Sequence, residues 1–113
     1  MRIVQLNELQ AITLDGSGNG QAQLGPTAAG EVWPAGYVVG VHCATNVAEA
    51  IARGWAGGGP PAGFLGATTW GSTGDTNADT PELKAGQSVT VQWAGGDPGT
   101  VAYLTVTGSR QVP

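Results

Sequence analysis

Residues 83–108, LKAGQSVTVQWAGGDPGTVAYLTVTG, decide the fold of this chain. In the first half of the stretch, apolar residues recur at every second position, at Val89, Val91 and Trp93. The same alternation returns in the second half, with Ala102, Leu104 and Val106 on one face and Val101, Tyr103, Thr105 and Thr107 on the other. A period of two is typical of a β-strand with one buried face. Residues 94–99 interrupt it, because proline has no N–H for a sheet and glycine accepts a positive φ. The pattern predicts a β-hairpin whose apolar face needs a second layer.

The rest of the chain contains further short apolar segments between turns rich in glycine, proline and aspartate. The predicted strands are residues 10–14, 21–24, 32–33, 37–43, 46–57 and 64–70, with a hairpin turn at 15–20 and a polar loop at 71–81. Residues 46–57 also fit a helix, although Gly54 disfavours one. About eight short strands without helix–strand alternation predict an all-β, single-domain antiparallel β-sandwich, either jelly-roll or Ig-like. Residues 1–9 fit neither pattern, so we expect an N-terminal arm at 1–9 and the sandwich domain at 10–113.

The composition excludes several classes of function. The 113 residues carry a net charge of −4, and only 11 % of them are charged, against about 25 % in ordinary domains. The four basic residues are scattered, which argues against a nucleic-acid surface. No segment approaches the roughly 20 apolar residues of a membrane helix. The single cysteine excludes an internal disulfide and indicates folding in a reducing cytoplasm.

No motif for catalysis, for a cofactor or for a metal is complete. Residues 15–20 and 75–79 carry Asp and Asn at alternate positions, as calcium loops do, but both ligand sets are incomplete, and Asx turns are the favoured interpretation. His42 and Cys43 are neighbours on a predicted strand, so their side chains point to opposite faces and cannot form a catalytic pair. The carboxylates are dispersed over turns and strand ends. We therefore predict that the protein is not an enzyme and needs no cofactor.

Several apolar and aromatic residues are candidates for contact with a partner. Trp55 and Trp70 lie near glycine-rich loops, where an exposed indole could meet a sugar or a neighbouring protein. The apolar residues expected to be exposed on a monomer are Ile3, Leu6, Trp55 and Phe64. An exposed apolar surface of this kind marks an interaction site.

Four segments carry a resemblance to a known group of proteins. They are TLDGSGNGQAQLGP (13–26), VWPAGYVVGV (32–41), FLGATTWGSTGDT (64–76) and the stretch 83–108. Their order resembles that of small β-domain virion proteins of tailed bacteriophages, especially those of actinobacterial hosts. The resemblance is a pattern of turns and strands that covers most of the chain beyond the first dozen residues, and residues 50–61 fit it poorly.

The resemblance implies a virion component: a capsid decoration (cement) protein, or a minor head or tail protein. Its implied partners are the major capsid protein and neighbouring copies of itself, as a monomer or a homotrimer. The implied location is the capsid surface, after synthesis in the host cytoplasm, and the group offers no catalytic residues to carry over. The alternative is a carbohydrate-binding module or minor tail protein that uses Trp55 and Trp70. An enzyme or enzyme-accessory domain ranks last for want of a site.

Overall fold

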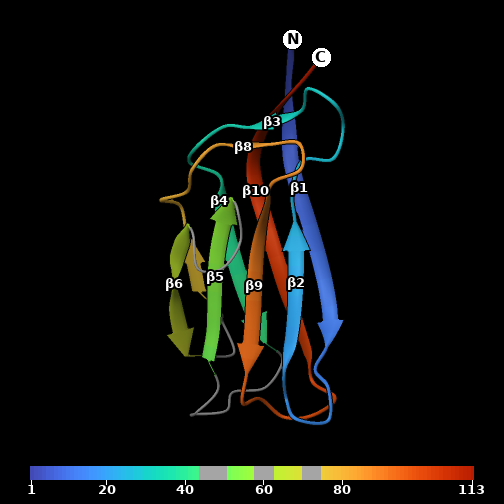
Figure 1. Cartoon of the computed structure of the whole chain (residues 1–113), viewed down its shortest axis with the longest axis vertical. Coiled ribbons are helices and arrows are strands. Elements are labelled where there is room, and N and C mark those ends of the chain that lie inside the picture. Colours follow the sequence, from blue (N-terminus) through green and yellow to red (C-terminus); the bar gives the residue numbers. More distant parts are fainter. Residues whose placement is uncertain (44–50, 58–62, 70–74) are drawn as a thin grey trace.

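A computed structural model describes residues 1–43, 51–57, 63–69 and 75–113 of the chain. These ranges contain strands and no helix (Figure 1). The strands are β1 Arg2–Thr13, β2 Gly20–Leu24, β3 Val32–Trp33, β4 Val38–Cys43, β5 Ile51–Gly57, β6 Phe64–Thr69, β7 Asp75–Asn77, β8 Leu83–Lys84, β9 Ser88–Ala94 and β10 Val101–Val112. All of the pairings are antiparallel, and the strands form two layers. The predicted all-β sandwich is confirmed.

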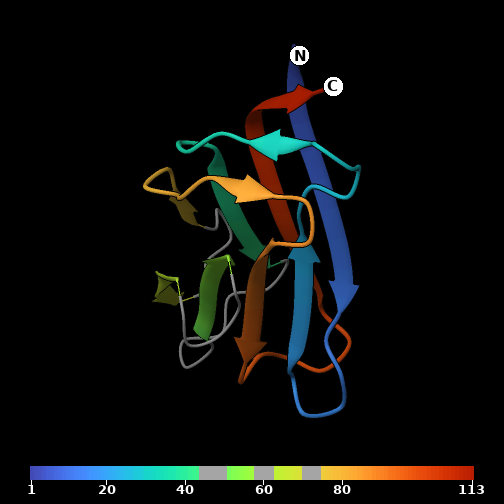
Figure 2. The same cartoon turned by 45° about the horizontal axis from the view of Figure 1, so that its top comes forward.

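The two sheets share no strand. Sheet A has the order β7-β4-β10-β3-β8, with β1 on the other side of β10. Sheet B has the order β2-β9-β5-β6. Strand β10 is paired with β1 over its whole length, from Val101 opposite Thr13 to Val112 opposite Arg2. Its opposite side is paired first with β4 and then with β3. The first and last strands of the chain are therefore neighbours, and both termini lie at the same end of the molecule (Figures 1 and 2).

The predicted hairpins are wrong. Strand β9 belongs to sheet B and β10 to sheet A, so residues 95–100 cross between the layers. The turn at 15–20 likewise leads from β1 in sheet A to β2 in sheet B. Both connections place the apolar faces of consecutive strands opposite each other across the core. In a hairpin, the two apolar faces would lie side by side and would still need a cover.

The core lies between the sheets, and it contains one set of alternating apolar residues from each half of residues 83–108. Its fully buried members include Val89, Val91 and Trp93 of β9 and Ala102, Leu104 and Val106 of β10. Burying each valine or leucine side chain of this set contributes about 1.5–3 kcal/mol. Trp33, Tyr37 and Leu83 extend the core toward the end where the termini lie. The predicted interior positions Val89, Val91 and Trp93 are confirmed, and in β10 the face with Ala102, Leu104 and Val106 is the buried one.

Several predicted boundaries differ from those in the structure. Residues 2–9 are not a separate arm, because they form the first two-thirds of β1 and pair with β10. Residues 51–57 form a strand, β5, and not the alternative helix. Strand β7 lies inside the predicted loop 71–81 and pairs with β4. Residues 44–50, 58–62 and 70–74 lie outside the described part of the chain.

The two turns that cross between the layers dock on each other. The backbone N–H of Gly96 donates to the carbonyl of Gly18 at 3.0 Å, and that of Gly95 donates to Asn19 Oδ1 at 3.3 Å. Within the first turn, Asp15 Oδ1 accepts the backbone N–H groups of Ser17 and Asn19, and these bonds lower the pKa of the Asp15 carboxyl. Gly18 has φ +74°, and a Cβ there would overlap the Gly96 carbonyl. The contact between the turns therefore requires glycine at position 18.

The substitution Gly18→Ala should lower the free energy of unfolding by about 2 kcal/mol or more, because both the backbone conformation and the contact resist a side chain. The matched control is Gly16→Ala in the same turn, where a Cβ would meet nothing within 4 Å. Denaturant unfolding of the two variants beside the wild type measures the difference. Equal stability of the two variants would contradict the role given to Gly18.

Candidate contact surface

The outer face of sheet A is the side of β1, β10 and β4 that points away from the core. On β1 the odd-numbered residues are all exposed, while the even-numbered residues from Val4 onward are buried or half-buried. The antiparallel register places odd-numbered residues of β10 and even-numbered residues of β4 on the same face. We define the outer face by Ile3, Gln5, Asn7, Leu9, Ala11 and Thr13 of β1, Val101, Tyr103, Thr105, Thr107, Ser109 and Gln111 of β10, and Val38, Gly40 and His42 of β4.

The outer face carries no Asp, Glu, Lys or Arg. It also holds most of the large apolar side chains that are exposed in the described part of the chain. Ile3 is 65 % exposed, Leu9 is 60 % and Val38 is 36 %, and Met1, at 88 %, directly precedes β1. An exposed apolar residue is ordinary by itself, but their collection on one uncharged sheet face is typical of a surface made for contact. The outer face is therefore our candidate functional surface.

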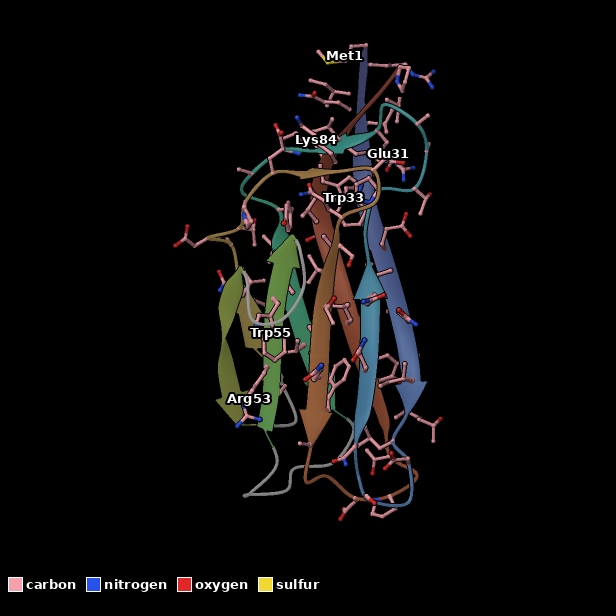
Figure 3. The ribbon with its side chains drawn as sticks, viewed as in Figure 1. Met1, Glu31, Trp33, Arg53, Trp55 and Lys84 are labelled. Carbon is pink, nitrogen blue, oxygen red and sulfur yellow. The ribbon has the colours of Figure 1, made fainter. Side chains whose placement is uncertain are left out.

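The charges of β1 and β10 lie on the opposite side of the sheet. Glu8 and Arg110 are even-numbered and form an ion pair, with Arg110 Nη1 3.3 Å from Glu8 Oε1. The same guanidinium is 3.7 Å from Glu31 Oε2, which also accepts a hydrogen bond from Trp33 Nε1 at 2.9 Å (Figure 3). Burial alone would raise the pKa of Glu31, but bonds from Trp33 and Ala28 and the Arg110 charge outweigh burial and lower it. The cluster ties β1, β10 and β3 together and leaves the outer face uncharged.

The substitution Glu31→Gln should destabilise the protein by about 1–3 kcal/mol near neutral pH, because it removes a charged acceptor from a buried site. Since the pKa of Glu31 is lower in the folded protein than its ordinary 4.5, the unfolded state takes up the proton first as the pH falls. The stabilisation by the ionised Glu31 is thus complete above about pH 4.5 and is lost as the pH falls through the folded pKa. Denaturant unfolding between neutral and acidic pH should show the gap between wild type and variant closing. A gap that persists below the folded pKa, or an equal effect of Glu82→Gln at an exposed position, would contradict this account.

Tyr37 packs beside this cluster. Its ring makes an edge-on contact with Trp33, with centroids 6.1 Å apart and planes at 72°. The Thr80 hydroxyl donates to the Tyr37 carbonyl at 2.7 Å, which joins the start of β4 to the segment before β8. Burial raises the pKa of the Tyr37 phenol from 10.0 to about 12. Burial therefore favours the neutral phenol at this site.

A Tyr103→Phe variant leaves Tyr37 as the only tyrosine, so its phenolate absorbance can be titrated alone. We expect a midpoint near pH 12 in the folded protein and near 10 in denaturant. Because the folded pKa is the higher one, the stability due to the neutral phenol is present below pH 10 and is lost as the pH rises toward 12. A midpoint near 10 in the folded protein would show that the phenol is open to water.

The outer face of sheet B has a different character. Trp55 of β5 lies opposite Thr90 of β9 on this face, but only 9 % of Trp55 is exposed. The side chains of Gln21 and Gln92 are joined across the strands at 3.2 Å, and those of Gln23 and Thr90 at 3.1 Å. Arg53 and Trp55 lie along the same strand (Figure 3). The prediction of an exposed Trp55 platform is therefore wrong, since the indole is covered.

The other predicted contact residues have different outcomes. The expected exposure of Ile3 is confirmed, whereas that of Leu6 is wrong, because Leu6 is even-numbered on β1 and is 0 % exposed in the core. Phe64 begins β6, and its side chain lies outside the described part, as does Trp70. Leu9 was not among the predicted surface residues. A period of two across residues 2–14 groups Leu6 with Ile12 and Leu14 and places Leu9 on the opposite face.

The acidic residues of the described part are dispersed, and the carboxylates of Asp15, Glu8 and Glu31 bond to other groups of the fold. Asp15 binds turn amides, Glu8 and Glu31 bind Arg110, and Asn77 accepts the N–H of Asp79 and donates to the carbonyl of Leu65. Within residues 1–43, 51–57, 63–69 and 75–113, no three His, Cys, Asp or Glu side chains are grouped closely enough to hold a metal ion. The same residues contain no helix of the length and hydropathy needed to span a membrane.

Comparison of the chain with protein-family models, with curated proteins and with solved structures gives no match in any of the three. The outer face is thus assigned from the geometry of the chain alone. Its lack of charge and its exposed apolar residues are properties that suit contact with a protein surface.

Proposed function

We propose that this protein is a structural component of a tailed-phage virion, a capsid decoration protein that binds the lattice of the major capsid protein. The observation that supports the proposal is the uncharged outer face of sheet A, with Ile3, Leu9 and Val38 exposed on it. The resemblance of residues 13–26 and 83–108 to such virion proteins supplies the partner. The function is adhesion, without turnover of a substrate.

An uncharged face suits this function for an energetic reason. Burying a charge against a partner costs free energy unless the charge is matched, whereas an uncharged face avoids that cost. Each large apolar side chain that becomes fully buried contributes up to about 1.5–3 kcal/mol. A few such residues give only weak binding per copy. Many copies on one particle bridge neighbouring capsid subunits and together stabilise the shell.

The proposal predicts hundreds of copies per particle, roughly in proportion to the capsid protein. Quantitative mass spectrometry of purified particles measures this ratio. Particles made without the protein should assemble but lose their genome at lower temperature, because the links between capsid subunits are missing. A handful of copies, or unchanged thermal stability of the particles, would contradict a decoration role.

The outer face itself can be tested with a charge. Leu9→Lys and Val38→Lys each place an ammonium on the face, where contact would bury it, and each should weaken binding to particles that lack the protein by about tenfold or more. The matched control is Gln92→Lys, at an exposed position on the outer face of sheet B. Binding is measured by co-sedimentation with the particles. Equal effects of all three substitutions would exclude the outer face of sheet A as the contact.

The second candidate function is a carbohydrate-binding module of a minor tail protein. The exposed Gln21, Gln92 and Arg53 on the outer face of sheet B favour it, because amides and guanidinium groups donate to sugar hydroxyls. The covered Trp55 disfavours it, because a sugar ring needs an exposed aromatic face. Binding to a glycan array that is lost in Arg53→Ala would favour this candidate, together with a low copy number per particle.

A further inference from the structure

The outer edge of β1 is open. Within the described part of the chain, β1 is paired only with β10, and it forms the outermost strand on its side of sheet A (Figures 1 and 2). Just beyond β1, the N–H of Leu14 donates to the carbonyl of Thr100 at 2.9 Å, in the same register as the strand pair. Even-numbered residues therefore bond to β10. By the alternation of an antiparallel ladder, odd-numbered residues of β1 direct their N–H and C=O groups toward the free edge.

The other edge strands of the described sheets are much shorter than β1, with two to six residues against twelve. Strands β7 and β8 have three and two residues. On β2, the backbone N–H of Gln23 donates a hydrogen bond to Gln10 Oε1 at 3.0 Å. On β6, the carbonyl of Leu65 accepts a hydrogen bond from Asn77 Nδ2 at 2.8 Å. Strand β1 has twelve residues with no proline, glycine, lysine or bulge. Proline, lysine and bulges are among the features by which proteins protect sheet edges, and the inward charge of Glu8 on β1 is matched by Arg110.

We propose that β1 pairs antiparallel with β1 of a second copy of this chain, across a two-fold axis that is perpendicular to sheet A and passes beside Leu6. In this register Ile3 lies opposite Leu9 of the second copy, and Gln5 lies opposite Asn7. These residues are odd-numbered, so they are the ones whose backbone groups are free to bond across the axis. A two-fold axis repeats each pair, so one strand satisfies the other without any further partner.

The side chains of β1 favour pairing with a second copy of the chain, in the register centred on Leu6. Ile3 and Leu9 are the exposed large apolar residues within the strand, and pairing about Leu6 brings each against the other twice. Glu8 falls diagonally across from Arg2 of the second copy, and no like charges face each other. Pairing about Gln5 would instead place Ile3 opposite Asn7. The side chains of β1 thus complement those of a second β1 that runs antiparallel to it. This complementarity favours a second copy of the chain over a foreign peptide.

The pairing would extend the outer face. An axis perpendicular to the sheet keeps the outer faces of both copies on the same side, so the pair would present one continuous uncharged surface. The pairing does not depend on the proposed virion function, since it can form in the isolated protein. It would give that function a bivalent unit.

Sedimentation velocity of the isolated full chain tests the pairing. We expect a concentration-dependent species of twice 11.3 kDa. Asn7→Pro removes an N–H that points to the free edge while sparing the bonds to β10, so it should weaken dimerisation by about tenfold or more. Asn7→Ala keeps that N–H and should dimerise like the wild type. A wild type that stays monomeric, or a dimer that survives in a folded Asn7→Pro protein, would overturn the proposal.

Cross-linking tests the register without relying on proline. In a Cys43→Ser background, Ile3→Cys mixed with Leu9→Cys should form a disulfide-linked pair, because residues opposite each other in a ladder have Cα atoms about 5.5 Å apart. Leu9→Cys alone should not cross-link, because position 9 of one copy would lie about 20 Å along the strands from position 9 of the other. Cross-linking of Leu9→Cys alone, or none in the mixture, would overturn this register.

A third variant separates the pairing from the proposed function. Val38→Lys lies on β4, away from the edge of β1, and should dimerise normally while binding particles poorly. Asn7→Pro should be monomeric, with its outer face still uncharged. Loss of dimerisation in Val38→Lys would overturn the assignment to the β1 edge. Normal dimerisation with unimpaired particle binding in Val38→Lys would count against the proposed contact face alone.

Discussion

The pairing of β1 with β10 is the constraint on which the rest of this structure depends. Twelve residues from one end of the chain are matched to twelve from the other, without a shift in register. Closing so long a loop has an entropic cost, but that cost grows only slowly with loop length, whereas the ladder gains a pair for every residue matched. The strands between them in the sequence must then lie on the other side of β10 or in sheet B. The Glu8–Arg110–Glu31 cluster strengthens this pairing at the end where the termini lie.

The same constraint explains why the chain arches between layers. Strand β10 is paired with β1 on one side and with β4 on the other, so β9 cannot pair with β10 in sheet A. It joins sheet B instead, where Val89, Val91 and Trp93 lie across the core from the inward residues of β10. The first connection follows the same rule, since β1 and β2 lie in different sheets. The two connecting turns meet at Gly18 and Gly96, and this contact closes the sandwich at the end remote from the termini.

One strand provides both of the surfaces to which we assign a function. The odd-numbered side chains of β1 belong to the outer face, and the backbone groups of the same residues form the open edge. A contact through the face and a pairing through the edge are therefore compatible, because they use different atoms of the same residues. The absence of charge serves both, since neither a packed face nor an extended sheet accommodates an unmatched ion without cost.

The sequence by itself determined that the chain is all-β, which of its residues 83–108 are buried, and that its surface carries few charges. These follow from local properties: a period of two reports which residues share a face, and glycine, proline and aspartate report where strands end. Only the tertiary structure decided which face of β1 is covered, that Trp55 is buried, and that β9 and β10, like β1 and β2, belong to different sheets. The physical reason is that alternation does not say which sheet a strand joins or which of its faces is covered. Those choices depend on partners far away in the chain, above all on the pairing of β1 with β10.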